Sequence, residues 1–185
     1  RMIWAYEDGN GRARPDETSF GAVASAWASS GTKEGVEKVE ALVEFQEELY
    51  RKGSAPDMAP NAILYNALAN AWANFKTKAS GDNAFRVLKR MRAQGVEPNT
   101  ITVNTILTAL ARSDDGKRAI IKADSIMEDT GSGKLPVLLD LISFNAYLDC
   151  LGRNGAPNAC QRVEETLQRH QQALFIVIRQ ALVPE

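Results

Sequence analysis

The chain has 185 residues, 44% of them hydrophobic, which is ordinary for a folded protein. Its 22 Lys and Arg residues are balanced by 23 Asp and Glu residues, and the net charge is −1. No overall field draws such a chain to a polyanion, so any polyanion site must be local. Two cysteines and one histidine provide neither a disulfide framework nor a zinc ligand set. We therefore expect no cofactor and no metal. We also expect no membrane insertion, since the apolar run at 174–178 is too short to cross a bilayer.

Four segments along the chain share one pattern and align without a gap: ETSFGAVASAW at 17–27, AILYNALANAW at 62–72, TITVNTILTAL at 100–110 and LISFNAYLDCL at 141–151. Their fifth residues are Gly21, Asn66, Asn104 and Asn145, which are 45, 38 and 41 positions apart. This period, with loops that vary, predicts stacked repeats and not one closed globule. We expect the tail of a cut repeat at 1–16 and units at 17–61, 62–99, 100–140 and 141–185, the last one degraded.

Each shared segment has apolar residues three and four positions apart, which indicates a helix with one buried face. A second apolar stripe follows in every unit, as in Val87 and Met91. The sequence therefore predicts a pair of helices in each unit, with all first helices on one side. The expected ranges are 17–29 and 34–51, 62–74 and 82–94, 100–112 and 117–129, and 141–153 and 157–170.

Turn residues separate these helices. A Pro-Asp or Pro-Asn pair ending at Asp16, Asn61 or Asn99 precedes a first helix, and its side chain can cap free N–H groups of the first turn. Trp27 and Trp72 occupy equivalent positions in their helices. We expect both to wedge into the shared core, because an aromatic residue at core spacing is more often packing than a ligand box.

Several motifs resemble the pentatricopeptide repeat family over essentially the whole chain. They are the aromatic-Asn pairs at 65–66 and 144–145, the Pro-Asn boundaries, and the segment AFRVLKRMRAQGVEPN at 84–99. The resemblance implies an all-α fold, an α-solenoid of stacked helix-turn-helix repeats that forms a right-handed superhelix. It also implies binding of single-stranded RNA on the concave face, with one nucleotide per repeat read by two or three side chains.

The resemblance further implies which residues read the bases. The fifth residue acts with the last residue of its unit, which pairs Asn66 with Asn99, favouring cytosine, and Asn104 with Asp140, favouring uracil. Asn145 implies a third pyrimidine, without an identifiable partner. An amide suits this role because it can both donate and accept hydrogen bonds. An aliphatic residue three positions earlier can press on the base from the side, at Ile63, Ile101 and Ile142. Gly21 departs from the pattern and is expected to read no base.

Phosphate contacts in the family come from a basic residue near the end of the first helix. Arg112 and Arg153 occupy that position here. The alternative is a solvated helix end, where an arginine lies favourably near the C-terminal end of the helix dipole. An insertion at 129–140 lengthens the exit from its unit, and it places Pro136 four residues before Asp140 instead of beside it.

No motif in the chain carries catalysis, since there is neither a Gly-rich phosphate loop nor a nucleophile patterned with a base, and we expect no enzyme. Two functions remain open. One is binding of single-stranded, pyrimidine-rich RNA in organellar RNA processing, stability or translation. The other is a helical scaffold that contacts protein subunits of a larger assembly. Three asparagines with preceding isoleucines favour RNA, whereas the near-neutral charge favours the scaffold. By the resemblance, both imply a mitochondrion or chloroplast, and the chain is expected to derive from a longer protein.

Overall fold

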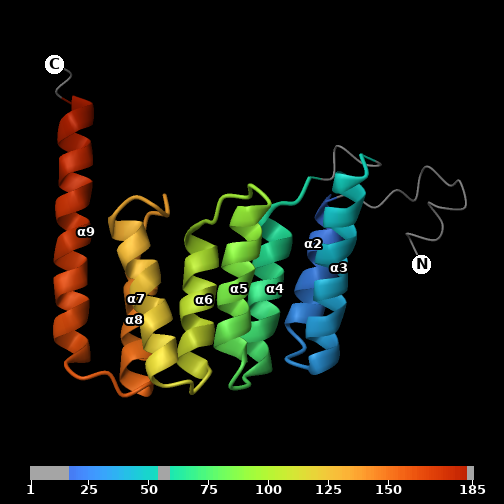
Figure 1. The fold of residues 1–185 in the computed structure, drawn as a ribbon, viewed down its shortest axis with the longest axis horizontal. Helices are drawn as coiled ribbons and strands as arrows, with labels where there is room; N and C mark the ends of the chain where they lie inside the picture. The colour runs from blue at the N-terminus through green and yellow to red at the C-terminus, as the bar shows by residue number, and fades with distance from the viewer. Residues whose placement is uncertain (1–16, 54–58, 183–185) are drawn as a thin grey trace, which may run out of the picture.

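The structure is a computed structural model that describes residues 17–53 and 59–182, so the repeat tail expected at 1–16 lies outside the described residues. Within this part of the chain there are eight α-helices and no strand, and the helices follow one another in sequence order along the long axis (Figure 1). They are α2 (Glu17–Ala28), α3 (Lys33–Arg51), α4 (Ala62–Phe75), α5 (Ser80–Ala93), α6 (Thr100–Arg112), α7 (Lys117–Gly131), α8 (Leu141–Arg153) and α9 (Ala159–Leu182). The predicted all-α class is confirmed.

The helix ranges predicted from the sequence agree with the structure to within two residues, except at the end of α9. That helix was expected to stop near 170, but it continues to Leu182. The reason lies in the sequence after His170, where Gln, Ala, Leu and Ile dominate and neither Gly nor Pro appears before Pro184. The prediction ended the helix where the repeat pattern faded, although nothing there breaks a helix.

Asparagine and aspartate side chains cap the first helices. Asn61, Asn99 and Asp140 are the N-cap residues of α4, α6 and α8, and each accepts hydrogen bonds from backbone N–H groups of the first turn. Asn99 and Asp140 form complete capping boxes, with Thr102 and Ser143 as the reciprocal partners. The caps fix the first turn of each helix, and with it the direction of the side chains at that end.

The helices form two layers with different packing. The first helices α2, α4, α6 and α8 each pack closely against the next one in the series. The second helices α5, α7 and α9 meet only sparsely, and α3 makes no close backbone contact with α5. Neighbouring helices therefore lie closer together in the layer of first helices. We call the exposed side of this layer the inner face.

The core runs along the whole stack, because first helices bury side chains against both neighbours. Leu110 and Leu151 are almost fully buried in it, with exposures of 1% and 0%. Trp27 and Trp72 occupy the same position in their helices but are only partly buried against the core, which corrects the expectation that they wedge inside. An indole is larger than the leucine side chain that is buried at this position in α6 and α8, and Trp72 packs edge-on against Phe75 with ring centroids 6.2 Å apart.

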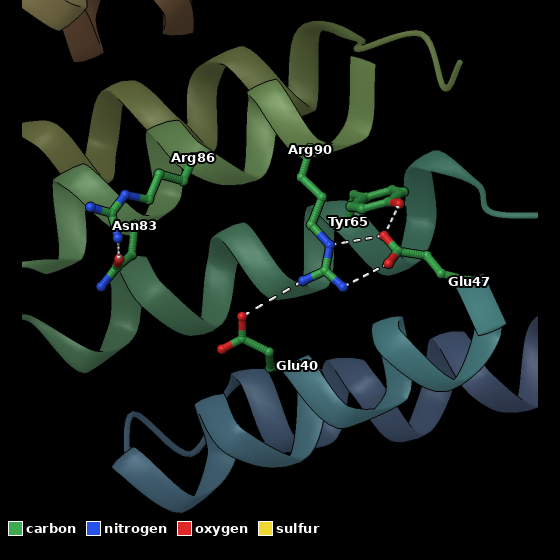
Figure 2. Close-up of polar contacts among 6 residues, drawn as sticks. All are labelled: Glu40, Glu47, Tyr65, Asn83, Arg86 and Arg90. Carbon is green, nitrogen blue, oxygen red and sulfur yellow. Dashed lines mark hydrogen bonds and ion pairs between the residues drawn. The ribbon is translucent and has the colours of Figure 1, made fainter. Parts of the chain in front are cut away.

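Ion pairs cross the gaps between second helices. In the first of them, Arg90 of α5 donates from Nε and Nη2 to the two carboxylate oxygens of Glu47 of α3, at 2.9 and 2.7 Å (Figure 2). The third guanidinium nitrogen lies 3.7 Å from Glu40, and the hydroxyl of Tyr65 donates to Glu47 at 2.5 Å. Two further pairs repeat this arrangement along the outer layer, Lys122–Asp82 between α7 and α5 and Arg162–Asp124 between α9 and α7.

Candidate nucleic-acid interface

Three isoleucines lie in register at the starts of α4, α6 and α8. Each is the second residue of its helix, and each is exposed although it is apolar: Ile63 is 51% exposed, Ile101 62% and Ile142 63%. Burying an isoleucine side chain stabilises a fold by about 1.5–3 kcal/mol, so leaving three of them exposed forgoes a substantial stabilisation. Together they offer a row of apolar contacts along one edge of the inner face.

Asn66 of α4 is hydrogen-bonded across the unit boundary to the start of α6. Its Nδ2 donates to Asn99 Oδ1 at 3.3 Å, and its Oδ1 accepts from the hydroxyl of Thr102 at 2.6 Å. Asn99 Oδ1 also accepts from the backbone N–H of Thr102 at 3.0 Å, which is the helix cap. The structure therefore brings together the two residues that the resemblance paired.

The same arrangement recurs one unit later. Asn104 Nδ2 donates to Asp140 Oδ1 at 3.2 Å, and the hydroxyl of Ser143 donates to Asn104 Oδ1 at 2.6 Å. The insertion at 129–140 does not displace Asp140, which caps α8 as Asn99 caps α6. A hydrogen bond of 2.8 Å from the Thr100 hydroxyl to the backbone carbonyl of Leu138 ties the end of the insertion to α6.

Asp140 is an exposed carboxylate with its charge stabilised. The backbone N–H of Ser143 lowers its pKa below the ordinary value, and the side chains of Asn104 and Ser143 and the backbone N–H of Ile142 act in the same direction. Hydrogen bonds to the ionised form, at the positive end of a helix dipole, are the physical cause. At neutral pH this side chain is an anionic hydrogen-bond acceptor.

The first and last units differ from the two in the middle. Gly21 is buried under the next unit, and a Cβ added to it would lie 2.9 Å from Cγ2 of Ile63. Asn145 is exposed on α8 and makes no side-chain hydrogen bond with any residue of 17–53 or 59–182. The complete Asn couple with its hydroxyl thus occurs twice in the described part of the chain.

The two candidate phosphate anchors stand in different electrostatic surroundings. Arg112 ends α6, is exposed, and has no ion-pair partner among the described residues. Arg153 ends α8 and donates from Nε to Asp149 Oδ1 at 2.6 Å. Both members of that pair are largely exposed, so the pair is weak and can open, but its carboxylate offsets the charge of Arg153.

Two members of these networks are absent from the prediction made on the sequence, Thr102 and Ser143. Both are 0% exposed. The signal for them is present in the repeat pattern. In α6 and α8 the third residue of the helix carries a hydroxyl, and the fifth residue of the preceding first helix is Asn66 or Asn104. In α4 the third residue is Leu64, and the fifth residue of the preceding first helix is Gly21. This correlation joins a residue of one unit to a residue of the next unit. An alignment of the repeats compares equivalent positions and does not show it.

The described residues do not gather three or more His, Cys, Asp or Glu side chains into a group that could hold a metal ion. None of the described helices has the length and apolar character to span a bilayer.

A series of helix pairs that share one core along the stack defines an α-solenoid repeat protein. Residues 48–112 match the family model of the pentatricopeptide repeat domain. A stretch of 63 residues is 36% identical to a pentatricopeptide repeat-containing protein of Arabidopsis thaliana, and it covers 34% of this chain and 10% of that relative. Residues 48–112 therefore match the pentatricopeptide repeat domain, the family that the resemblance predicted. Pentatricopeptide repeats are non-catalytic helical modules of a class that generally binds RNA, and the matched range includes Asn66, Asn99, Asn104 and Arg112.

Proposed function

We propose that the chain binds single-stranded RNA along the inner face, with one base per unit, in RNA processing, stability or translation in a mitochondrion or chloroplast. The observation that carries this proposal is the repeated couple of hydrogen-bonded side chains, Asn66 with Asn99 and Asn104 with Asp140, beside exposed isoleucines. An unstacked base needs polar groups at its edge and apolar groups against its faces. Units 62–99 and 100–140 supply both. The organelle is inferred from the family, whose members typically act there.

The two couples differ in what they offer to a base. Asn99 uses its Oδ1 for the cap and for Asn66, so its amide NH₂ remains as a donor, whereas the Asp140 carboxylate can only accept. Cytosine presents an acceptor at N3, and uracil presents an N–H donor at the same place. This supports the assignment of cytosine to Asn66 with Asn99 and of uracil to Asn104 with Asp140. Asn145 would take a third pyrimidine with less discrimination, because it lacks a partner.

The isoleucines supply the contacts to the base faces. A base at Asn66 would lie between Ile63 and Ile101, and a base at Asn104 would lie between Ile101 and Ile142. Each of these side chains is more than half exposed and is free to cover a flat ring. Gly21 offers no polar side chain, and Ile63 lies directly over it, which supports the expectation that unit 17–61 reads no base.

The proposal is tested by binding titrations of short fluorescent single strands that carry cytosine-uracil, uracil-cytosine, adenine-guanine or guanine-adenine at the central pair. Asn66→Ala is expected to fold normally and to lose about 1–3 kcal/mol of binding, or roughly 5- to 150-fold in Kd. The matched control is Asn83→Ala on the second helix α5, where Asn83 Oδ1 accepts from Arg86 and from no other described residue (Figure 2). Equal effects of the two changes would contradict base reading at Asn66.

A protein scaffold is the second candidate, and two observations favour it. Arg153 is paired with Asp149, which leaves Arg112 as the unpaired candidate anchor. In addition, Leu138 and Leu141 are 76% and 78% exposed beside the same edge of the inner face. If Asn66→Ala and Arg112→Gln both leave RNA affinity unchanged while each weakens co-purification with a protein assembly, the inner face is a protein interface.

A further inference from the structure

We infer that Thr102 and Ser143 are positioning residues, whose hydroxyl groups fix the orientation of the base-reading amide in the preceding unit. The inference rests on the proposed function and adds to it a residue class outside the reading couples. Thr102 would orient Asn66, and Ser143 would orient Asn104.

Each hydroxyl is held by contacts on two sides. The Thr102 hydroxyl accepts a hydrogen bond from the backbone N–H of Asn99, and the Ser143 hydroxyl accepts one from the backbone N–H of Asp140, both at 3.1 Å. The single hydrogen of each hydroxyl therefore remains for donation, and the shortest contact, 2.6 Å in both cases, is to the Oδ1 of the reading asparagine. A second acceptor, the Oδ1 of the cap residue, lies farther away at 3.0 Å. Because both hydroxyls are fully buried, water does not compete for this bond.

The network allows one orientation of the amide. Asp140 is an acceptor without a proton, so the Asn104 atom that faces it must be the nitrogen. The oxygen then faces Ser143. A rotation of the amide by 180° would place its oxygen against the carboxylate, where no proton lies between the two oxygens. It would also give up the 2.6 Å hydrogen bond that the Ser143 hydroxyl donates to the amide oxygen. The rotation therefore loses the bond to Asp140 and adds repulsion, so the amide presents its donor and acceptor to a base in a fixed order.

The first boundary of the stack provides an internal comparison. There the fifth residue is Gly21, which has no amide to orient, and the position equivalent to Thr102 and Ser143 is Leu64, a buried core residue with 2% exposure. Hydroxyl and amide thus occur together at two boundaries and are both missing at the third. A helix cap alone does not explain this, because α4 is capped by Asn61 without a hydroxyl at the third position.

The consequence is that neighbouring units are coupled in recognition. The base read by unit 62–99 depends on a side chain that belongs to unit 100–140, and unit 100–140 depends in turn on Ser143. Replacing Thr102 should therefore change the selectivity at one base and leave the selectivity at the next base as it was. A residue that merely stabilised the fold would weaken all strands by the same factor.

The test compares Thr102→Val, which removes the hydroxyl at nearly constant volume, with Thr102→Ser, which retains it. The matched control is Thr108→Val on the same helix, where the hydroxyl donates to a backbone carbonyl at 2.8 Å and not to a reading amide. We expect Thr102→Val to reduce the preference for cytosine at the Asn66 base by about two- to tenfold, the factor that one hydrogen bond of ordinary strength provides. Thr102→Ser should restore it, and Thr108→Val should leave it unchanged.

A double-mutant cycle separates positioning from stability. In an Asn66→Ala background, Thr102→Val should have no further effect on RNA affinity, because there is no amide left to orient. The same loss in both backgrounds would overturn the inference.

A measurement without RNA keeps the inference distinct from the proposed function. In the ¹⁵N-labelled protein, the side-chain NH₂ signals of Asn66 should shift toward those of a solvent-exposed amide in Thr102→Val and stay in place in Thr102→Ser. Unchanged signals in Thr102→Val would overturn the inference. A protein that shows the expected signals but binds none of the strands refutes the proposed function and leaves the amide orientation established.

Discussion

Asn99 and Asp140 use the same side chain for two tasks, a helix cap and a hydrogen bond to an asparagine of the preceding unit, Asn66 or Asn104. The cap engages Oδ1 in both residues, because this oxygen accepts the backbone N–H of the third helical residue. Under the proposed function, the group that remains for a base is therefore an NH₂ in Asn99 and a carboxylate oxygen in Asp140. Since Asn and Asp cap a helix equally well, exchanging them should change recognition without disturbing the fold.

Asp140→Asn is accordingly expected to convert the preference at its base from uracil to cytosine, with a thermal midpoint close to that of the wild type. The reason is that a donor replaces an acceptor while the cap and the bond to Asn104 are retained. A shift of about 1 kcal/mol, or roughly fivefold in the ratio of the two Kd values, is expected for one exchanged hydrogen bond. Titration with strands that differ only at this base measures it. An unchanged ratio would show that Asp140 does not contact the base edge.

At the residue scale, the sequence led to the contact between paired side chains, whereas it misplaced a tryptophan of the core; the base-reading role of these pairs stays a prediction. The pairing of Asn66 with Asn99 followed from the repeat resemblance, and one direct hydrogen bond joins the two side chains. Trp72 was misplaced because helical periodicity gives the side of a helix on which a residue lies, but not the width of the gap that it faces. Thr102 was overlooked because its importance arises from a neighbour 36 positions away, Asn66, and a hydroxyl has no periodic signature.

At the scale of helices, the inner and outer layers are held together by different forces. First helices pack by buried apolar contacts, whereas the second helices are bridged across gaps by charged side chains. Tyr65 of α4 donates to the same carboxylate of Glu47 that binds the arginine of α5, so one group joins three helices (Figure 2). The arrangement recurs at Asp124, which accepts from Tyr147 at 2.7 Å and from Arg162 at 2.6 Å. The sequence shows these charges but not their partners, because the partners lie on different helices.

The Glu47 bridge gives stability a pH dependence of defined sign. Burial raises the pKa of Glu47, but the hydrogen bonds from Arg90 and Tyr65 outweigh it, and the pKa lies below its ordinary value. A carboxylate whose pKa is lowered by folding stabilises the fold above its unfolded pKa of about 4.3, and this contribution disappears as the pH falls through the lowered value.

Glu47→Gln should therefore lower the free energy of unfolding by about 1 kcal/mol at pH 7, and by less at pH 3. Urea titrations at both pH values measure the difference. Glu128→Gln, which removes an exposed carboxylate of α7, is the control and should have little effect at either pH. A cost that stayed constant down to pH 3 would assign the role of Glu47 to packing and not to its charge.

Two helical glycines differ in the space around them, and we expect opposite effects on stability when each is replaced by alanine. A Cβ at Gly35, in the first turn of α3, would lie 2.6 Å from the backbone carbonyl oxygen of Trp27, whereas a Cβ at Gly152 of α8 would meet nothing within 4 Å. Gly35→Ala should cost about 1–3 kcal/mol, because backbone must move to admit the methyl group. Gly152→Ala should stabilise by about 0.5–1 kcal/mol, because alanine favours a helix. Thermal unfolding of the two variants checks the contrast, and equal midpoints would contradict the packing at α2 and α3.

At the scale of the whole molecule, the period of the sequence was sufficient to predict the order of the helices and their division into two layers. It did not give the wider spacing between neighbouring second helices, and the right-handed superhelix stays a prediction. The distribution of charge also appears only at this scale. Arg90, Lys122 and Arg162 are engaged in bridging the outer layer, so they are not available to a ligand. The candidate anchors that the resemblance implies, Arg112 and Arg153, lie instead at the ends of the first helices α6 and α8.

The salt dependence of RNA binding tests this account of the charges. Each phosphate neutralised on a single strand contributes about −0.7 to the slope of log K against log salt, so two anchors give a slope of about −1.4. Arg112→Gln should weaken all strands equally and reduce the slope by about 0.7, whereas Arg118→Gln on the second helix α7 should change neither. Asp149→Asn should strengthen binding, because it frees Arg153 from its 2.6 Å contact. A slope much steeper than −1.4 in the wild type would mean that other cations contact the RNA and that the two arginines are not its principal anchors.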